Sequence, residues 1–146
     1  MGSDGEFTDI LFMPGGGSKT PITAENAHLA LQTIHMSGKE VYKQAVIAML
    51  AAARKAIDDA GLRVEDIACV IPHQANLRII EAIGERLGIP REKVFVNVDR
   101  YGNTSAASVG IALDEANRSG RIKRGDYVLM VVFGGGLTWA STLVEW

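Results

Sequence analysis

Three groups of residues combine hydrogen-bond donors with an even spacing along the chain. His73 and Asn103 stand 30 residues apart, and Phe133, which precedes the glycine run Gly134–Gly136, follows after another 30. An imidazole N–H, a carboxamide NH2 and the amides of a glycine turn can all donate to an oxyanion or an enolate. None of these residues is an obvious nucleophile. The pattern therefore predicts stabilisation of a developing negative charge.

Each group follows a predicted strand. An apolar run at Ile67–Ile71, a valine-rich stretch at Lys93–Val98 and a buried run at Tyr127–Phe133 all have strand length. A spacing of about one strand–helix–strand repeat brings their carboxyl ends to one edge of a parallel sheet, where ligands of such sheets bind. We therefore expect the side chains of His73 and Asn103 to come within a few ångström of each other.

Helical patterns separate these strands. The S-x-x-E sequence Ser37–Glu40 predicts a capping box that opens a helix ending at Gly61. The other expected elements are a strand at 10–13, a helix from about 79 to Gly88, a helix capped by Thr104 or Ser105 that ends at Gly120, and a last strand at 137–144. This order predicts a single α/β domain over residues 1–146, with a mixed, mostly parallel sheet of about five strands and helices on both faces.

Each candidate residue also has a structural interpretation. His73 could be a structural histidine, Asn103 a left-handed turn residue, and Gly134–Gly136 only a hairpin turn. Asn76 could be the N-cap of the helix that follows His73. The coincidence of all these features at matching strand ends favours the functional interpretation.

Composition excludes several classes of protein. Hydrophobic residues make up 47% and charged residues 22% of the 146 residues, and the formal net charge is −2. This balance is typical of a globular domain and shows no excess of basic residues for binding nucleic acid or a membrane surface. No apolar run is long enough for a membrane span, and no secretory signal is visible. We expect a cytoplasmic protein with no metal and no cofactor.

Two further features are set aside as functional sites. The stretch Gly15–Thr20 resembles a phosphate-binding loop, but Ser18 precedes Lys19 where that loop needs glycine. The single cysteine, Cys69, lies within an apolar strand and has no neighbour in sequence that would lower its pKa. We expect it to be buried and to react slowly with alkylating reagents.

Three segments carry a resemblance to a known family. The sequences that start at Pro72 (PHQANLR), Tyr101 (YGNTSAAS) and Phe133 (FGGGLTW) resemble β-ketoacyl-acyl-carrier-protein synthase III in order and spacing. This is a condensing enzyme of the thiolase superfamily, and the similarity runs from about Ser3 to Trp146. It covers only the C-terminal one of the family's two pseudo-symmetric halves, so it implies one half of a thiolase-like fold.

The resemblance implies a role for each site residue in decarboxylative condensation of malonyl-acyl carrier protein with an acyl thioester. By resemblance, His73 and Asn103 are catalytic donors to the malonyl thioester oxygen. Gly135 supplies a backbone amide near the acyl thioester, and Phe133 and Asn76 bind substrate, with Phe133 pressing an apolar ring on the malonyl carboxylate. Arg78 resembles a basic residue at the carrier-protein docking surface.

The match to one half alone implies that residues from elsewhere complete the site. The family's nucleophilic cysteine lies in the N-terminal half, and Cys69 is not at that position. The implied partners are acyl carrier protein, coenzyme A thioesters and an N-terminal half. Small residues nearly surround the helix at 105–116, so without that half we expect the chain to form a dimer and to be inactive alone. The alternative is a non-catalytic module that binds the carrier protein or assists assembly.

Overall fold

A four-stranded sheet forms the centre of the molecule, and the structure, a computed structural model, describes residues 1–146. The strand order is β1 (Gly2–Ser3), β6 (Thr138–Glu145), β5 (Tyr127–Gly134) and β4 (Ile67–Pro72). β4 and β5 are parallel, whereas β6 runs antiparallel to both β5 and β1. One parallel pairing thus places the carboxyl ends of β4 and β5 side by side.

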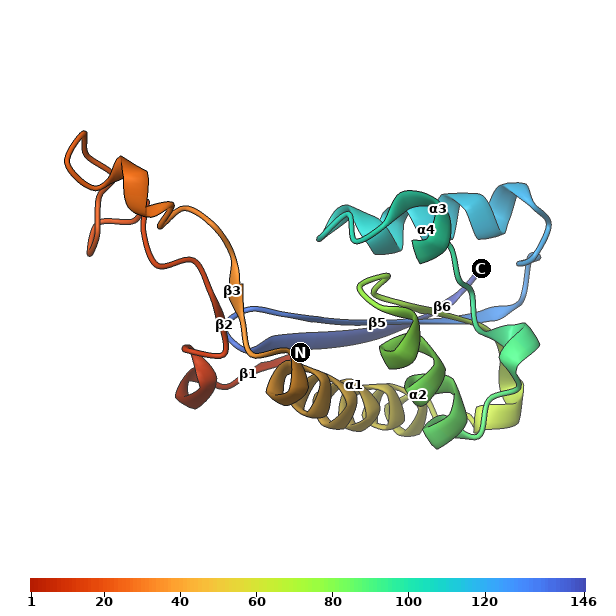
Figure 1. Cartoon of the computed structure of the whole chain (residues 1–146). Coiled ribbons are helices and arrows are strands. Elements are labelled where there is room, and N and C mark those ends of the chain that lie inside the picture. Colours follow the sequence, from red (N-terminus) through yellow and green to blue (C-terminus); the bar gives the residue numbers. More distant parts are fainter.

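Helices cover both faces of this sheet (Figure 1). α1 (Gly38–Asp59) and α2 (Leu77–Leu87) lie on one face, and α3 (Val98–Tyr101) and α4 (Ala107–Arg118) lie on the other. Short 3-10 helices occupy connections at Gly5–Phe7, Ala27–Leu29, Val64–Asp66 and Arg91–Lys93. The expected α/β fold with a mixed sheet and helices on both faces is confirmed. The sheet has four strands instead of about five, and of its pairings only β4–β5 is parallel, so it is not mostly parallel. No helix of the chain has the length and apolar character needed to cross a bilayer.

The two faces of the sheet bury separate apolar clusters. Successive side chains of a strand point to opposite faces, so Leu129 and Val131 of β5 pack toward α1 and α2, whereas Val128 packs toward α4. α1 presents a stripe at helical spacing to the larger cluster, namely Val41, Ala45, Met49, Ala53 and Ile57. This packing fixes the plane of β4 and β5 between the two helical layers.

The prediction of a strand at Lys93–Val98 is wrong. This segment makes one isolated parallel bridge, between Val94 and Val70, and one further hydrogen bond from the Phe95 N–H to the Val70 carbonyl. The main-chain N–H groups of Asn97 and Val98 instead donate to a side chain, described below, and the chain turns into α3. Tertiary hydrogen bonds therefore override the strand preference of the valines.

The N-cap prediction is confirmed for one helix and is wrong for the two others. Asn76 caps α2 as predicted, because its Oδ1 accepts from the Arg78 N–H at 2.9 Å. Ser37 occupies the N-cap of α1, but its side chain makes no capping hydrogen bond. α4 begins at Ala107, and neither Thr104 nor Ser105 caps it. The φ angle of Ser105 is +55°, a left-handed conformation, so its backbone is unsuited to the N-cap position.

Residues 13–34 form an extension, here called the arm. β2 (Leu11–Phe12) pairs antiparallel with β3 (His35–Met36) at its base, which confirms a short strand near residue 10. Figure 1 shows the arm projecting away from the sheet and its helices. Apolar side chains are exposed along it and at its base, namely Phe12, Met13, Ile22, Leu29, Ile34 and Met36.

Candidate functional site

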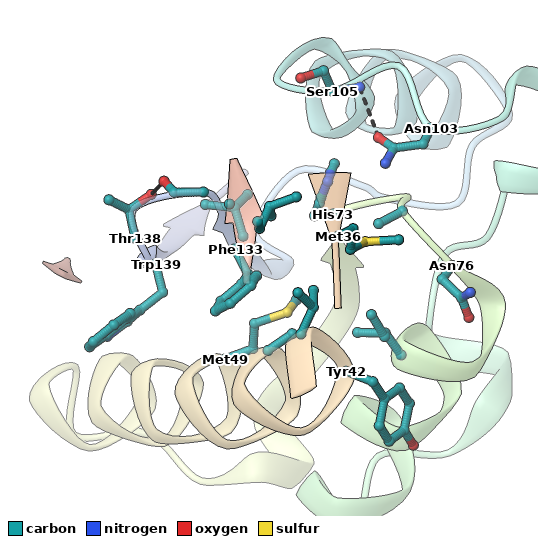
Figure 2. Close-up of a pocket in the computed structure, with 18 of the residues that line it drawn as sticks. Met36, Tyr42, Met49, His73, Asn76, Asn103, Ser105, Phe133, Thr138 and Trp139 are labelled. Atoms are coloured by element: carbon teal, nitrogen blue, oxygen red, sulfur yellow. Dashed lines mark hydrogen bonds between the residues drawn. The ribbon is translucent and has the colours of Figure 1, made fainter. Parts of the chain in front are cut away.

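A cavity of about 1120 Å3 lies where β4 and β5 end. Residues from β2, β3, α1, the start of α2, the loop before α4 and the β5–β6 turn line it. All six candidate site residues are among them: His73, Asn76, Arg78, Asn103, Phe133 and Gly135. The tertiary structure therefore brings these residues to one cavity, although the segment that leads to Asn103 is not a strand. Figure 2 shows how their side chains lie.

His73 is held at the end of β4 by its backbone and by its ring. Its main-chain N–H donates to the Val131 carbonyl at 2.8 Å, which extends the pairing with β5 by one residue. Its Nδ1 lies 2.6 Å from the Oγ of Ser108 on α4. Burial lowers the pKa of His73 below its ordinary value of 6.5. Burial of the half-buried imidazole therefore favours its neutral form.

Asn103 is oriented by the loop that precedes α4. Its Oδ1 accepts a hydrogen bond from the Ser105 N–H at 2.9 Å, so the amide oxygen is occupied and the NH2 group is free to donate. In Figure 2 the carboxamide nitrogen lies on the side where His73 is found. The alternative of Asn103 as a left-handed turn residue is wrong, because Gly102 and Ser105 have the positive φ angles in this loop.

Gln74 links the His73 loop to the segment that leads to Asn103. It is 1% exposed, and its carboxamide makes four hydrogen bonds. Its Nε2 donates to the carbonyls of Pro72 and Phe95 at 2.8 and 3.1 Å, and its Oε1 accepts from the N–H groups of Asn97 and Val98 at 2.9 and 3.2 Å. This role of Gln74 is not predicted from the sequence, because a lone glutamine after a histidine does not indicate its tertiary partners.

Glu115 on α4 fixes the other end of that segment. Its carboxylate accepts from the Asn97 Nδ2 at 2.9 Å and from the Tyr101 hydroxyl at 3.4 Å, and it forms an ion pair with Arg100. The hydrogen bond from Asn97, followed by that from Arg100, lowers the pKa of Glu115. α3 is therefore anchored to α4 just before Gly102, which limits the positions available to Asn103.

Asn76 and Arg78 flank the cavity at the start of α2. The amide oxygen of Asn76 is used in capping, so its NH2 group remains as the donor that a ligand can meet. Arg78 lies in the first turn of α2. Its guanidinium carbon is 5.6 Å from the centre of the Tyr42 ring on α1, a distance typical of a cation–π contact.

Phe133 and Gly135 approach the cavity from β5 and the turn that follows it. Phe133 is 8% exposed, and its ring lies between the sheet and α1, beside Met49 (Figure 2). Phe133 therefore contributes to the core as well as to the cavity wall. Gly135 passes close to the backbone of β2, since a Cβ at this position would lie 3.3 Å from the Leu11 carbonyl oxygen. A larger residue there would press against β2.

Cys69 lies in the opposite apolar cluster, under α4, and is fully buried. Burial raises the pKa of its thiol to about 11. The expectation of a buried cysteine is confirmed, and at physiological pH the thiol is protonated. No group of three or more His, Cys, Asp or Glu side chains in the chain could hold a metal ion.

Comparison with known proteins gives a consistent result. Residues 57–146 match the family described as 3-oxoacyl-[acyl-carrier-protein] synthase III C terminal. The whole chain is 53% identical to the beta-ketoacyl-[acyl-carrier-protein] synthase III of Roseiflexus sp. (strain RS-1) and 55% identical to that of Desulfitobacterium hafniense. It spans 44% of the length of each of these two relatives.

Solved structures agree with this match. The crystal structure of the synthase III from Thermus thermophilus is 48% identical and superimposes with a TM-score of 0.85 over 99% of this chain and 44% of that one. The synthase III from Pseudomonas aeruginosa gives a TM-score of 0.87 at 35% identity, over 99% of this chain and 42% of that one. The chain thus matches less than half of each whole protein.

Proposed function

Because the chain belongs to the 3-oxoacyl-[acyl-carrier-protein] synthase III C-terminal family, we propose that it supplies the donor half of a condensing active site. The observation that carries this proposal is the pairing of His73 and Asn103 on one cavity. The amide oxygen of Asn103 and one ring nitrogen of His73 are already occupied within the chain. Each side chain therefore keeps a nitrogen for an incoming ligand.

The proposed reaction develops negative charge where these nitrogens point. Malonyl on acyl carrier protein loses carbon dioxide, and the electrons of the broken C–C bond move to the thioester oxygen as an enolate. The enolate carbon then attacks an acyl thioester carried on a cysteine, and the cysteine leaves as a thiolate. Hydrogen bonds from His73 and Asn103 to the enolate oxygen lower the barrier, and a donor of this kind contributes about 3–4 kcal/mol.

The other cavity residues have supporting roles in this proposal. The backbone amide of Gly135 donates to the oxygen of the acyl thioester as it becomes tetrahedral. The buried ring of Phe133 presents an apolar surface to the malonyl carboxylate, which favours its departure as neutral carbon dioxide. Asn76 offers its free NH2 group to the substrate, and Arg78 lies on the rim where an acidic carrier protein and its phosphopantetheine arm would approach.

A partner half is required for this chemistry. The nucleophilic cysteine has no counterpart in this chain, because Cys69 is buried, protonated and on the far side of the sheet from Phe133. We propose that an N-terminal half brings that cysteine, and that it covers two apolar surfaces of this chain. These surfaces are the exposed side chains of the arm and the outer face of α4 around Ala107 and Gly110.

Reconstitution tests the proposal. The chain is mixed with an N-terminal half of a synthase III, and carbon dioxide release from malonyl-acyl carrier protein is measured with and without an acyl-coenzyme A donor. We expect condensation only in the mixture. A mixture that forms a stable complex, and whose N-terminal half is acylated, but that releases no carbon dioxide would contradict the proposal and favour a non-catalytic carrier-protein-binding module.

A further inference from the structure

We propose that the Ser108 hydroxyl is a positioning group that keeps the single proton of the neutral His73 ring on Nε2. Ser108 lies in the first turn of α4 and is 2% exposed. Its Oγ makes two contacts, one at 2.6 Å with the His73 Nδ1 and one at 3.2 Å with the main-chain nitrogen of Gln74. These contacts join the loop that carries His73 to the helix that follows Asn103.

The number of available protons decides which atom donates and which accepts in each of the two contacts of the Ser108 Oγ. A main-chain N–H only donates, so Oγ is the acceptor toward Gln74. The hydroxyl has one proton of its own, and the His73 Nδ1 is its only hydrogen-bonding partner that can accept. The proton therefore points at Nδ1, and an Nδ1 that accepts carries no hydrogen. In the neutral ring the hydrogen then resides on Nε2.

The tautomer with its hydrogen on Nδ1 is disfavoured because it leaves the Ser108 hydroxyl proton without an acceptor. If Nδ1 carried the hydrogen, Oγ would accept from both His73 and Gln74, and its own proton would have no acceptor in a buried site. An unsatisfied buried donor is costly, by an amount equivalent to about tenfold or more in the tautomer ratio. A doubly protonated ring would meet the same conflict. The serine thus selects the neutral ring with an Nε2 hydrogen.

This role deepens the proposed function and rests on it for its catalytic meaning. A donor to the enolate oxygen must present a hydrogen, and Ser108 occupies the other nitrogen so that Nε2 carries it. The Ser105 N–H does the equivalent for Asn103 by occupying the amide oxygen. Both catalytic donors are therefore oriented by residues of one short segment, 105–108, that leads into α4.

Nitrogen NMR on the isolated chain tests the tautomer directly. With 15N-labelled histidine, long-range 1H–15N spectra distinguish Nε2–H from Nδ1–H rings, and the His73→Gln variant assigns the His73 signals. We expect an Nε2–H ring in the wild-type chain. In the Ser108→Ala variant we expect the Nδ1–H form to rise about tenfold in proportion. Ser108→Thr keeps the hydroxyl and should restore the wild-type pattern, whereas Ser119→Ala, a serine removal at the other end of α4, should not change it.

Two outcomes would overturn the proposal. One is an Nδ1–H ring in the wild-type chain, a result that needs no variant to fold. The other is a folded Ser108→Ala variant whose tautomer ratio equals that of the wild type. Carbon dioxide release in the reconstituted mixture provides the separate readout of function, where we expect Ser108→Ala to be about tenfold slower and Ser108→Thr to recover. If a stable complex with an acylated N-terminal half releases no carbon dioxide while the spectra follow the expectation, the proposed function fails and the role of Ser108 in the tautomer stands.

Discussion

The side-chain oxygen of Gln74 lies 2.9 Å from the main-chain nitrogen of Asn97, and this hydrogen bond ties the His73 loop to the start of α3. The same oxygen also accepts from the Val98 N–H, while the amide nitrogen donates to two carbonyls. A single buried side chain thus satisfies four backbone groups from two segments. Few other residue types offer two donor hydrogens and an acceptor oxygen at one end of a flexible side chain.

Replacing Gln74 by methionine should strongly destabilise the chain. Methionine has a similar length but removes four hydrogen bonds to buried or partly buried backbone groups, and each buried group left unsatisfied costs about 1–3 kcal/mol. We expect the free energy of unfolding to fall by about 3 kcal/mol or more. Urea denaturation followed by circular dichroism measures the change. The matched control is Gln44→Met on α1, which removes one side-chain hydrogen bond to Glu40 and should cost less than about 0.5 kcal/mol.

Changing Asn103 to aspartate separates its two polar atoms. The carboxylate can still accept from the Ser105 N–H, but it presents a negative charge to the enolate where the amide presented a donor. We expect carbon dioxide release by the reconstituted mixture to fall by about 10²–10³-fold or more, with little change in the stability of the chain. A variant that keeps more than a tenth of the wild-type rate would remove Asn103 from the catalytic site.

The pH dependence of stability should contain a contribution from His73. Its folded-state pKa is lowered by burial, so the unfolded chain binds the proton more tightly. This contribution is fully present above the ordinary pKa of 6.5 and is lost as the pH falls toward the lowered folded value. Denaturation midpoints measured from pH 7.5 downwards should therefore fall less steeply in a His73→Gln variant. Equal slopes for the two proteins would show that His73 titrates alike in both states.

Cys69 should react slowly with thiol reagents in the folded chain. The thiolate is the reactive form, and burial both raises the thiol pKa to about 11 and shields the sulfur. We expect modification by a maleimide or a disulfide reagent at pH 8 to be at least about 100-fold slower than for free cysteine. The unfolded chain in guanidinium serves as the control and should react at the rate of a free thiol. Rapid labelling of the folded chain would indicate that β4 opens readily.

The isolated chain should self-associate through its exposed apolar surfaces. The outer face of α4 carries Ala107 and Gly110 in the open, and the arm exposes several large apolar side chains. Each Å2 of apolar area left in water costs about 25 cal/mol, which favours a dimer or a complex with an N-terminal half. Sedimentation equilibrium at tens of micromolar measures this association. We expect a dimer for the wild-type chain.

Variants that add a negative charge to α4 test whether this helix forms the interface between associated chains. Ala107→Glu puts a carboxylate at the exposed start of α4 and should shift the chain toward monomer. Asn117→Glu adds the same charge near the other end of α4 and should leave association nearly unchanged. A monomeric wild-type chain would show that the exposed surfaces do not suffice for dimerisation, and equal association of both variants with the wild type would place the interface elsewhere.

The sequence by itself determined the fold class and the residues proposed for the site, because both depend on local patterns. Apolar runs and helical periodicity predicted β4, β5, β6 and the main helices, and residue types singled out His73, Asn103 and Phe133, which line one cavity. Residue types were enough to identify hydrogen-bond donors, since an imidazole or a carboxamide carries its chemistry wherever it lies.

Only the tertiary structure decided how those donors are held. The composition of residues 93–98 predicts a strand. In the structure, the N–H groups of Asn97 and Val98 donate to the side-chain oxygen of Gln74, and the chain continues into α3. From the sequence Ser108 is predicted only as a small residue of a helix, whereas packing places its hydroxyl within hydrogen-bond distance of the His73 Nδ1. These contacts join residues 21 to 35 positions apart, and no local pattern encodes them. Each arises because a buried polar group must find a partner, and only the packed chain determines which partner is within reach.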